Sequence, residues 1–275
     1  MAQNERFLIF IPCYRCEKQI SRTLTQLSGV EGLDCEILVL DNRSPDGTVE
    51  VAIQTADKLA MPVKVARNDE NYGLGGSHKA AFDFAIEHDF DYLIVLHGDD
   101  QGNVADLLPL IAAGKHRDVD CLLGARFMKG SCLQGYSAFR TFGNRVFNRL
   151  FSAVAGQRLY DLGAGLNLYK VNSLKKSQWR YFGNDLTFNY YMILASAAWG
   201  WSLRFFPISW REDDQLSNVK LFRQAKRTIS LLLEFAFAKK SFLAKNHSGR
   251  ESGKYTSTIV YSNRADQGSQ DASML

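Results

Sequence analysis

Two adjacent carboxylates, Asp99 and Asp100, follow a short apolar run and precede an amide, Gln101. The run, residues 92–97, is rich in Leu, Ile and Val, which is typical of a strand buried on both faces. Acids at the carboxyl end of such a strand lie where open α/β sheets bind ligands. Their oxygens suit Mg²⁺ or Mn²⁺ carrying a diphosphate. A solvated acidic turn is the alternative, and the pair alone leaves both interpretations open.

Two other apolar runs, residues 7–11 and 35–40, also predict buried strands. Helical patterns separate the runs at short spacing, which is typical of right-handed βαβ units and a mainly parallel sheet. Because parallel strands end at one edge of a sheet, we expect the three strand ends to form one cleft. The residues at the two additional ends are Pro12, Tyr14, Asp41, Asn42 and, in the following turn, Asp46.

A glycine-rich loop, residues 71–77, follows a third predicted strand at 63–66. Its glycines are not spaced as G-x-G-x-x-G, so the loop does not favour a nicotinamide or flavin site. Gly73 and Gly75 instead predict a backbone that can approach a ligand closely. Lys79, in the helix that follows, is either a phosphate contact or a solvated helix residue.

Length and composition restrict the class of protein. The chain has 275 residues, 46% of them hydrophobic, which is enough for one large domain or two small ones. A net charge of +4 lacks the dense basic signature of a nucleic-acid binder, but it suits an anionic small substrate or membrane surface. Five scattered cysteines do not predict a disulfide framework. We expect no signal peptide and no membrane-spanning helix, hence a cytoplasmic protein, at most peripheral at the inner face of a membrane.

Several motifs in order resemble family 2 glycosyltransferases of the GT-A fold, and most of all their dolichol- and polyprenyl-phosphate sugar synthase branch. They are IPCY, DNRSPDGT, NYGLGGSHKAA and HGDDQ, followed by LLGARF, DLGAG and PISW. The likeness covers residues 7–220. It implies an α/β, GT-A (Rossmann-like) three-layer fold with a mainly parallel central sheet, here with a C-terminal helical extension.

The resemblance also implies a donor site for a nucleoside-diphosphate sugar. Pro12 and Tyr14 would border the nucleoside, and Asp41 would accept hydrogen bonds from the base. The remaining substrate-binding candidates on this side are Asn42, Asp46, Gly73, Gly75, Lys79 and Gly98.

For the metal, Asp99 matches the second acid of the family's D-x-D motif and would ligate Mg²⁺ or Mn²⁺ under the diphosphate. Gln101 matches a glutamine that commonly follows and is the second metal candidate. His97 stands where the first acid is usually found. A neutral imidazole can ligate Mn²⁺ or simply form a hydrogen bond, and Asp100 could compensate for the missing carboxylate.

On the acceptor side, the resemblance implies that Arg126 and Arg140 hold a lipid phosphate, since a guanidinium binds phosphate in a bidentate manner. Asp185, at a predicted helix start, is either the general base for a hydroxyl acceptor or a charge that stabilises the helix. Arg211 and Lys220 fit a basic loop that closes over the diphosphate.

Residues 140–155 form an amphipathic basic segment, either an interfacial helix on a membrane or a helix packed on the sheet. We expect three regions: a GT-A domain at 1–220, a helix at 221–244 and a polar, disordered tail at 245–275. The helix could lie on a membrane or join two copies in a homo-oligomer.

The sequence therefore predicts an inverting, metal-dependent glycosyltransferase acting on a polyprenyl phosphate or a glycan hydroxyl in the synthesis of cell-envelope polysaccharides or other glycoconjugates. Two alternatives stay open. A nucleotide-sugar-binding subunit without catalysis would explain His97. A sugar nucleotidyltransferase would share the sheet and the metal, but its usual glycine- and lysine-rich loop after the first strand is missing.

Overall fold

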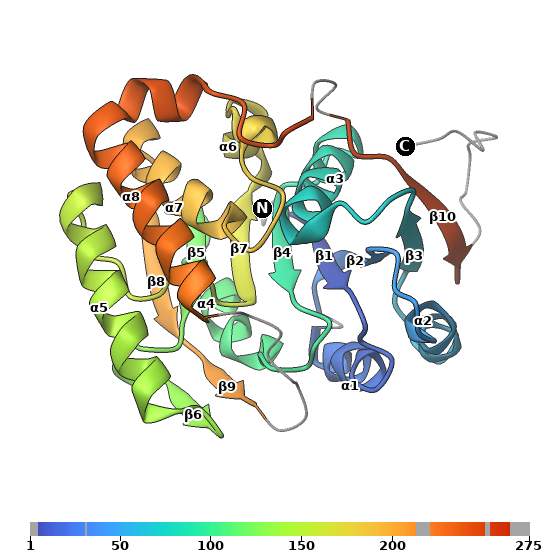
Figure 1. The fold of residues 1–275 in the computed structure, drawn as a ribbon. Coiled ribbons are helices and arrows are strands. Elements are labelled where there is room, and N and C mark those ends of the chain that lie inside the picture. The colour runs from blue at the N-terminus through green and yellow to red at the C-terminus, as the bar shows by residue number, and fades with distance from the viewer. Residues whose placement is uncertain (1–4, 31, 213–220, 251–253, 265–275) are drawn as a thin grey trace.

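A sheet of eight strands forms the centre of the computed structural model, which describes residues 5–30, 32–212, 221–250 and 254–264 (Figure 1). The strands are β1 (Arg6–Cys13), β2 (Asp34–Asp41), β3 (Val63–Asn68), β4 (Tyr92–Leu96), β5 (Cys121–Ala125), β7 (Leu166–Lys170), β8 (Leu203–Pro207) and β10 (Ser257–Ser262). Their order is β10-β3-β2-β1-β4-β7-β5-β8. Only β7 and β10 run antiparallel to their neighbours, so the sheet is mainly parallel, as predicted.

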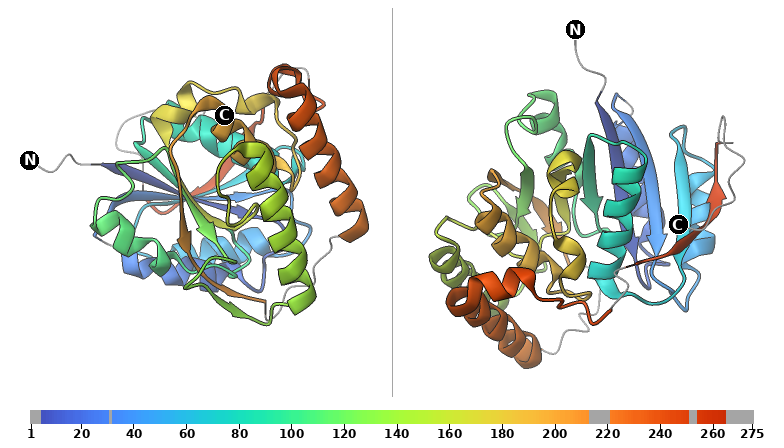
Figure 2. Two further views of the ribbon diagram at one scale, coloured as in Figure 1. Left: turned by 90° about the vertical axis from the view of Figure 1, so that its left-hand side faces the viewer. Right: turned by 90° about the horizontal axis from the view of Figure 1, so that it is seen from above.

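Helices cover both faces of this sheet (Figures 1 and 2). One layer contains α1 (Ile20–Thr25), α2 (Thr48–Ala56) and α4 (Leu108–Ala112), with the 3₁₀ turns η1 (Gln26–Val30) and η2 (Val104–Asp106). The other contains α3 (Gly73–Glu87), α6 (Val171–Lys175), η3 (Trp179–Tyr181) and α7 (Phe188–Trp199). At one end of the molecule α5 (Ala138–Ala155) and α8 (Leu221–Ala244) lie side by side, and a small parallel sheet pairs β6 (Cys132–Gln134) with β9 (Ser209–Arg211).

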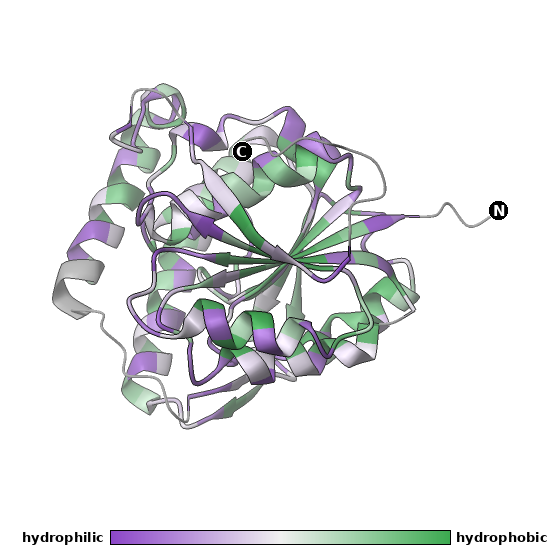
Figure 3. Ribbon diagram, turned by 90° about the vertical axis from the view of Figure 1, so that its right-hand side faces the viewer, coloured by the Kyte–Doolittle hydropathy of each residue, from purple (hydrophilic) through white to green (hydrophobic). Residues whose placement is uncertain are grey.

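The alternation of side chains along each strand builds two cores. In β1, Leu8 and Phe10 point into the core under α3 and α7, whereas Ile9 and Ile11 point into the core under α1 and α2. All four side chains are fully buried. Figure 3 shows the resulting apolar strands at the centre of the molecule. A strand buried on both faces has no polar face, which is why these runs are continuous rather than alternating.

The expected three-layer α/β architecture is confirmed, but the prediction of a disordered tail is wrong in part. Residues 257–262 form β10, which pairs antiparallel with β3 and closes one edge of the sheet. The segment STIVYS is rich in β-branched residues, and β3 offers it a free edge. The polar composition of the surrounding tail concealed this short strand. Residues 203–211 form two short strands, β8 in the large sheet and β9 in the small one.

Candidate active site

The carboxyl ends of β1, β2 and β4 are joined to one another by backbone hydrogen bonds. Asn42 N donates to Cys13 O at 2.9 Å, and Gly98 N donates to Pro12 O at 3.1 Å. A Cβ atom on Gly98 would lie only 2.5 Å from Cys13 Sγ, so this approach requires glycine. The order of the strands reverses between β1 and β4, which is where ligands bind in open α/β sheets. The predicted convergence of the strand ends is thus confirmed.

The two adjacent acids at the end of β4 have different surroundings. Asp100 is buried with a left-handed φ of 57°, and its carboxylate binds Arg22 at 2.6 Å and also Arg211. Asp99 has no ion pair among the described residues and accepts a long hydrogen bond of 3.4 Å from Gln101 N. Burial raises the pKa of Asp99 to about 6, an effect that the charge of Asp100 increases and nearby N–H groups oppose. Asp99 is therefore the acid available to a ligand.

His97 replaces the expected first acid and lies on the α3 side of the sheet. Its ring packs against Gly165, where a Cβ would come within 2.8 Å, and lies 6.1 Å from the ring of His78. Burial lowers the pKa of His97 to about 4, so the imidazole is neutral at pH 7. His97 Nε2 is buried without a hydrogen-bond partner among the described residues.

Near the expected nucleoside position, Pro12 is buried and Tyr14 presents an exposed ring, 45% accessible. Asp41 is fully buried, and its oxygens accept from Ser44 N at 3.1 and 3.2 Å and face Arg67 at 3.2 Å. The chain itself therefore already satisfies much of the hydrogen-bonding capacity that the resemblance assigned to a base.

Asn42 and Asp46, two further substrate-binding candidates near the end of β2, stabilise turns of the chain. Asn42 accepts from Tyr72 N at 2.8 Å and donates to Asn71 Oδ1 at 2.9 Å. The carboxylate of Asp46 accepts from Thr48 N and Oγ1, at 3.3 and 2.6 Å. Both side chains hold the loops around the strand ends in place.

The glycine-rich loop approaches the protein's own backbone rather than a ligand. Gly73 has a left-handed φ of 71°, and a Cβ there would lie 2.4 Å from Asn184 O. Gly75 N donates to the same carbonyl at 2.7 Å, and a Cβ on Gly75 would lie 2.5 Å from Gly183 O. The expectation of a ligand contact is corrected: these glycines make room for the segment that carries Asp185.

Lys79 is neither a phosphate contact nor solvated, so both expectations for it are wrong. Its side chain is fully buried and donates to Phe182 O at 2.5 Å, Asn184 Oδ1 at 2.7 Å and Tyr255 Oη at 3.0 Å. Burial lowers the pKa of Lys79 to about 7. Three neutral acceptors replace the phosphate that the sequence suggested.

The arginines expected to bind phosphate are paired with acids in the structure. Arg126 makes a buried bidentate pair with Asp161, at 2.8 and 2.9 Å. Arg140 binds Glu212 at 2.5 Å. Arg211 binds Asp100, as described above. Lys220 lies outside the described residues.

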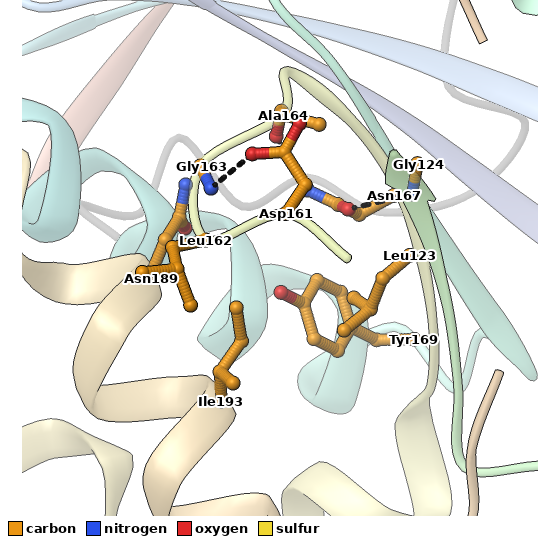
Figure 4. A pocket seen from close by; sticks show the side chains of 10 residues that line it. All are labelled: Leu123, Gly124, Asp161, Leu162, Gly163, Ala164, Asn167, Tyr169, Asn189 and Ile193. Atoms are coloured by element: carbon orange, nitrogen blue, oxygen red, sulfur yellow. Dashed lines mark hydrogen bonds between the residues drawn. The ribbon is translucent and has the colours of Figure 1, made fainter. Parts of the chain in front are cut away.

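Two hollows flank the edge that carries Asp99. The first is a small pocket beside Asp161, where Gly163 N donates to the Asp161 carboxylate at 3.1 Å (Figure 4). Asn189, on α7, also lines it (Figure 4). The second, of about 390 Å³, lies between α1 and β9 and is lined by Gln101, Arg211 and other residues. Asp99 is not among its lining residues, and Gln101 as a metal ligand stays a prediction.

Asp185 lies at the end of the turn that precedes α7. One of its oxygens accepts from Thr187 N at 2.9 Å and from Thr187 Oγ1 at 2.6 Å. The other oxygen pairs with Arg227 on α8. The contacts with Thr187 agree with a structural role for Asp185 at the start of α7, and the general-base role stays a prediction.

The donor set at the end of β4 fits a divalent cation that brings ligands of its own. Among the residues that the structure describes, Asp99 offers a carboxylate free of ion pairs, and His97 offers a neutral imidazole with an unpartnered nitrogen. Across the described ranges, no group of three or more His, Cys, Asp or Glu side chains could hold a metal unaided. Mg²⁺ commonly binds one or two carboxylates together with substrate phosphates, which agrees with this sparse set.

The sequence model described as Glycosyl transferase family 2 matches residues 8–177, more than half of the chain. The chain belongs to this family. The match includes the three joined strand ends, Asp99 and Asp161, and it ends before Asp185 and the arginines of β9 and α8.

Among curated relatives of this glycosyltransferase, the undecaprenyl-phosphate mannosyltransferase of Micrococcus luteus is 27% identical over 173 residues, 62% of this chain and 68% of the relative. The polyprenol monophosphomannose synthase of Mycolicibacterium smegmatis is 26% identical over 178 residues, 63% of this chain and 64% of the relative. The chain thus spans about two thirds of the length of these relatives.

Solved structures support the fold. Glucosyl-3-phosphoglycerate synthase of Mycobacterium tuberculosis, in a complex with Mn²⁺, uridine diphosphate and phosphoglyceric acid, superposes with a TM-score of 0.62 at 13% identity, covering 93% of this chain and 86% of that one. Mannosyl-3-phosphoglycerate synthase of Rubrobacter xylanophilus gives 0.60 at 14% identity, covering 91% and 78%. The glycosyltransferase therefore has the expected GT-A-like fold.

The structure also reveals four residues near the candidate site that were not predicted to belong to it: Asp161, Asn184, Tyr255 and Arg227. Asp161 is the buried partner of Arg126, and its place before the two glycines of DLGAG was the available signal. Asn184 and Tyr255 hold Lys79, and Arg227 binds Asp185. No local pattern marks these three, because their partners lie far away in the sequence.

Proposed function

We propose that this glycosyltransferase is an inverting, metal-dependent enzyme that transfers a sugar from a nucleoside-diphosphate sugar to a polyprenyl phosphate. One observation carries the donor half of the proposal: three joined strand ends present Asp99 as an acid that forms no ion pair with any described residue. Bound Mg²⁺ or Mn²⁺ would neutralise the diphosphate and make it a better leaving group. Asp99 would supply the charged protein ligand, and the exposed ring of Tyr14 would border the nucleoside.

The chemistry of the acceptor decides whether the enzyme needs a base. A hydroxyl must lose its proton as it attacks, whereas a phosphate is already anionic. Attack from the face opposite the diphosphate would invert the anomeric centre. Asp185 already accepts two hydrogen bonds and an ion pair, which favours an acceptor that needs no base.

A surface of α5 and α8 supports a lipid acceptor. On these two adjacent helices, seven large apolar side chains are exposed among the residues whose burial the structure describes, and Phe139 and Phe237 are 78% and 87% accessible. We call this surface the α5/α8 face; its apolar residues are Phe139, Phe142, Val146, Leu150, Ile229, Leu233 and Phe237. Exposed apolar rows of this kind mark interaction sites.

The positive charge of α5 and α8 favours an anionic partner. They contain eight Arg or Lys residues and one Glu, although the whole chain has a net charge of only +4. Exposed Arg145, Arg149, Lys239 and Lys240 accompany the apolar side chains. Within the described part of the chain, no helix is long and apolar enough to cross a bilayer. We therefore propose that the α5/α8 face lies on an anionic membrane surface that also contains the acceptor.

A transfer assay tests the reaction. The protein is incubated with Mn²⁺, a panel of nucleoside-diphosphate sugars and a short-chain polyprenyl phosphate, and release of nucleoside diphosphate is measured. Release that depends on the polyprenyl phosphate supports the proposal. Release that depends instead on a glycan identifies a hydroxyl acceptor. Binding without turnover supports the non-catalytic subunit, and pyrophosphate release from an NTP and a sugar phosphate supports a nucleotidyltransferase.

Vesicle flotation tests the membrane contact. Phe142→Ser combined with Phe237→Ser should lower binding to anionic vesicles, because the two substitutions remove two aromatic rings from the α5/α8 face. Ile259→Ser, on the exposed side of β10, is a matched control that should bind as the wild type does. Equal binding by all three proteins would refute the membrane contact. Light scattering without vesicles detects self-association through α8, the other expectation for this helix.

A further inference from the structure

The ion pair of Arg227 is more exposed to solvent than that of Arg126, another arginine expected near the acceptor. The side chain of Arg126 is 11% exposed, and its partner Asp161 is 2% exposed. The side chain of Arg227 is 57% exposed and its partner Asp185 is 39% exposed. An exposed ion pair contributes little stability, so an incoming anion can share or replace it at small cost. An anion reaching Arg126 would instead have to separate a buried pair.

The position of Arg227 suits a phosphate attached to a lipid. It lies in the same helix as Ile229 and Leu233 of the exposed apolar row, but the helical period turns its side chain away from that row, to the flank of α8 that meets Asp185. A long cationic side chain on this flank can reach a lipid phosphate whose chain contacts the apolar row. A guanidinium also binds phosphate through two parallel hydrogen bonds.

Ring contacts place the turn before α7 on the same side of the sheet as the end of β4. Phe188, the first residue of α7, lies 5.3 Å from the ring of His78, and His78 lies 6.1 Å from the ring of His97. Phe188, three residues after Asp185, and His97 therefore contact the same buried imidazole. A group bound by Arg227 would approach the donor site from this side.

The turn that carries Asp185 is braced by a buried polar network. Asn184 O accepts from Gly75 N at 2.7 Å, and Asn184 Oδ1 accepts from Lys79 Nζ at 2.7 Å. Tyr255 Oη also donates to Asn184 Oδ1, at 2.6 Å. In return, Asn184 Nδ2 donates to Ser248 O at 2.8 Å. The segment before β10 therefore fixes the residue next to Asp185.

We infer that Arg227 binds the anionic phosphate of the acceptor and that Asp185 is a positioning residue, which orients the guanidinium and is itself held by the Lys79–Asn184–Tyr255 network. This inference rests on the proposed function, because it assigns a residue to the acceptor of that reaction. It gives α8, which lies beyond the part matched to the family, a direct role in recognising the acceptor.

The decisive experiment compares Arg227→Gln with Lys226→Gln, a control on the neighbouring exposed residue with the same change of charge. The acceptor is a short-chain, water-soluble polyprenyl phosphate, and no vesicles are present. Loss of a charged hydrogen bond should raise the acceptor KM by about 10- to 100-fold in Arg227→Gln. The donor KM and the slow release of nucleoside diphosphate without acceptor should not change. Lys226→Gln should behave as the wild type does, and Arg227→Lys should recover part of the affinity.

Two further variants separate positioning from general-base catalysis. If Asp185 orients Arg227, Asp185→Asn raises the acceptor KM while kcat changes little; a base would instead show a large loss of kcat. Tyr255→Phe should raise the acceptor KM in the same sense, by less. Tyr261→Phe is the control. Tyr261 lies on the same C-terminal segment as Tyr255, but its hydroxyl bonds to Asp57, so its removal should not change the acceptor KM.

The outcomes distinguish this inference from the proposed function. If the wild type releases no nucleoside diphosphate with any acceptor, the proposed function fails. If the wild type transfers sugar but Arg227→Gln matches Lys226→Gln, the inference is wrong and the proposed function stands. If Arg227→Gln weakens transfer only when anionic vesicles are added, Arg227 binds membrane lipid rather than the acceptor, and the inference is again overturned.

Discussion

The donor and acceptor sides that we propose for this glycosyltransferase differ in how their charged groups are paired. At the end of β4, Asp99 has no ion pair within the described residues. Across the sheet, Arg126 pairs with Asp161 and Arg140 pairs with Glu212. A cation can approach Asp99 without displacing a protein group, whereas a phosphate approaching either arginine must compete with an acid. The donor side is thus prepared for its ligand, and the acceptor side is held together by its own charges.

The largest expected effect tests whether the acceptor-side pairs are structural. Arg126→Met leaves Asp161 buried without a counter-charge, so the free energy of unfolding should fall by about 3–5 kcal/mol. Arg140→Met, at a more exposed pair, should lower it by about 1 kcal/mol or less. Urea unfolding monitored by circular dichroism measures both. Equal losses of unfolding free energy in the two variants would show that the Arg126–Asp161 pair stabilises the fold no more than the less buried Arg140–Glu212 pair does.

The donor half should respond in activity rather than in stability. Asp99→Asn removes the charged ligand, so metal-dependent release of nucleoside diphosphate should fall by more than about 100-fold. The melting temperature at pH 7 should not fall and should rise if anything, because burial disfavours the charge of Asp99 and no described residue forms an ion pair with it. Asp100→Asn is the matched control: it breaks the contacts with Arg22 and Arg211, so its melting temperature should fall. Near wild-type turnover in Asp99→Asn would show that the metal assignment is wrong.

A pH experiment examines the buried cation of the acceptor half. The pKa of Lys79 is lowered to about 7, below its ordinary value of 10.5, by burial first and then by Arg250, while Asp185 opposes the shift. Between these two values the unfolded chain binds more protons than the folded one, so this group makes stability rise with pH. From pH 7 to pH 9 the wild type should gain about 2 kcal/mol relative to Lys79→Met. A difference independent of pH would indicate an ordinary pKa for Lys79.

The smallest expected effect concerns the partly buried pair of Arg140 and Glu212. Glu212→Gln removes the competing acid, so the acceptor KM should fall by a few-fold, within the range of a surface ion pair. Steady-state kinetics with the short-chain polyprenyl phosphate measures this change. An unchanged KM would mean that Arg140 does not contact the acceptor, contrary to the role that the family resemblance implies.

The donor half was predictable because its signals are local. Runs of buried residues predict strands, and parallel strands end at one edge, so Tyr14, Asp41 and Asp99 could be placed together. The separation of Asp99 from Asp100 was not predictable, because it depends on Arg22 and on Arg211, which is 111 residues away from Asp100.

The acceptor half depends on contacts between distant segments, so less of it could be predicted. Arg126 and Asp185 were recognised as charged candidates, but their partners Asp161 and Arg227 lie in other elements. Lys79 illustrates the same limit. Its burial follows from the carbonyl of Phe182 and from Tyr255 in the C-terminal segment, and neither appears in the local helical pattern.

The most direct test of the donor site is a crystal structure with Mn²⁺ and a nucleoside diphosphate, in which anomalous scattering locates the metal. The account predicts a manganese peak within coordination distance of the Asp99 carboxylate, with the diphosphate oxygens completing its ligands and Asp100 still bound to Arg22 and Arg211. A manganese ion bound by Asp100 or Asp41 instead, or a diphosphate bound away from the joined ends of β1, β2 and β4, would contradict it.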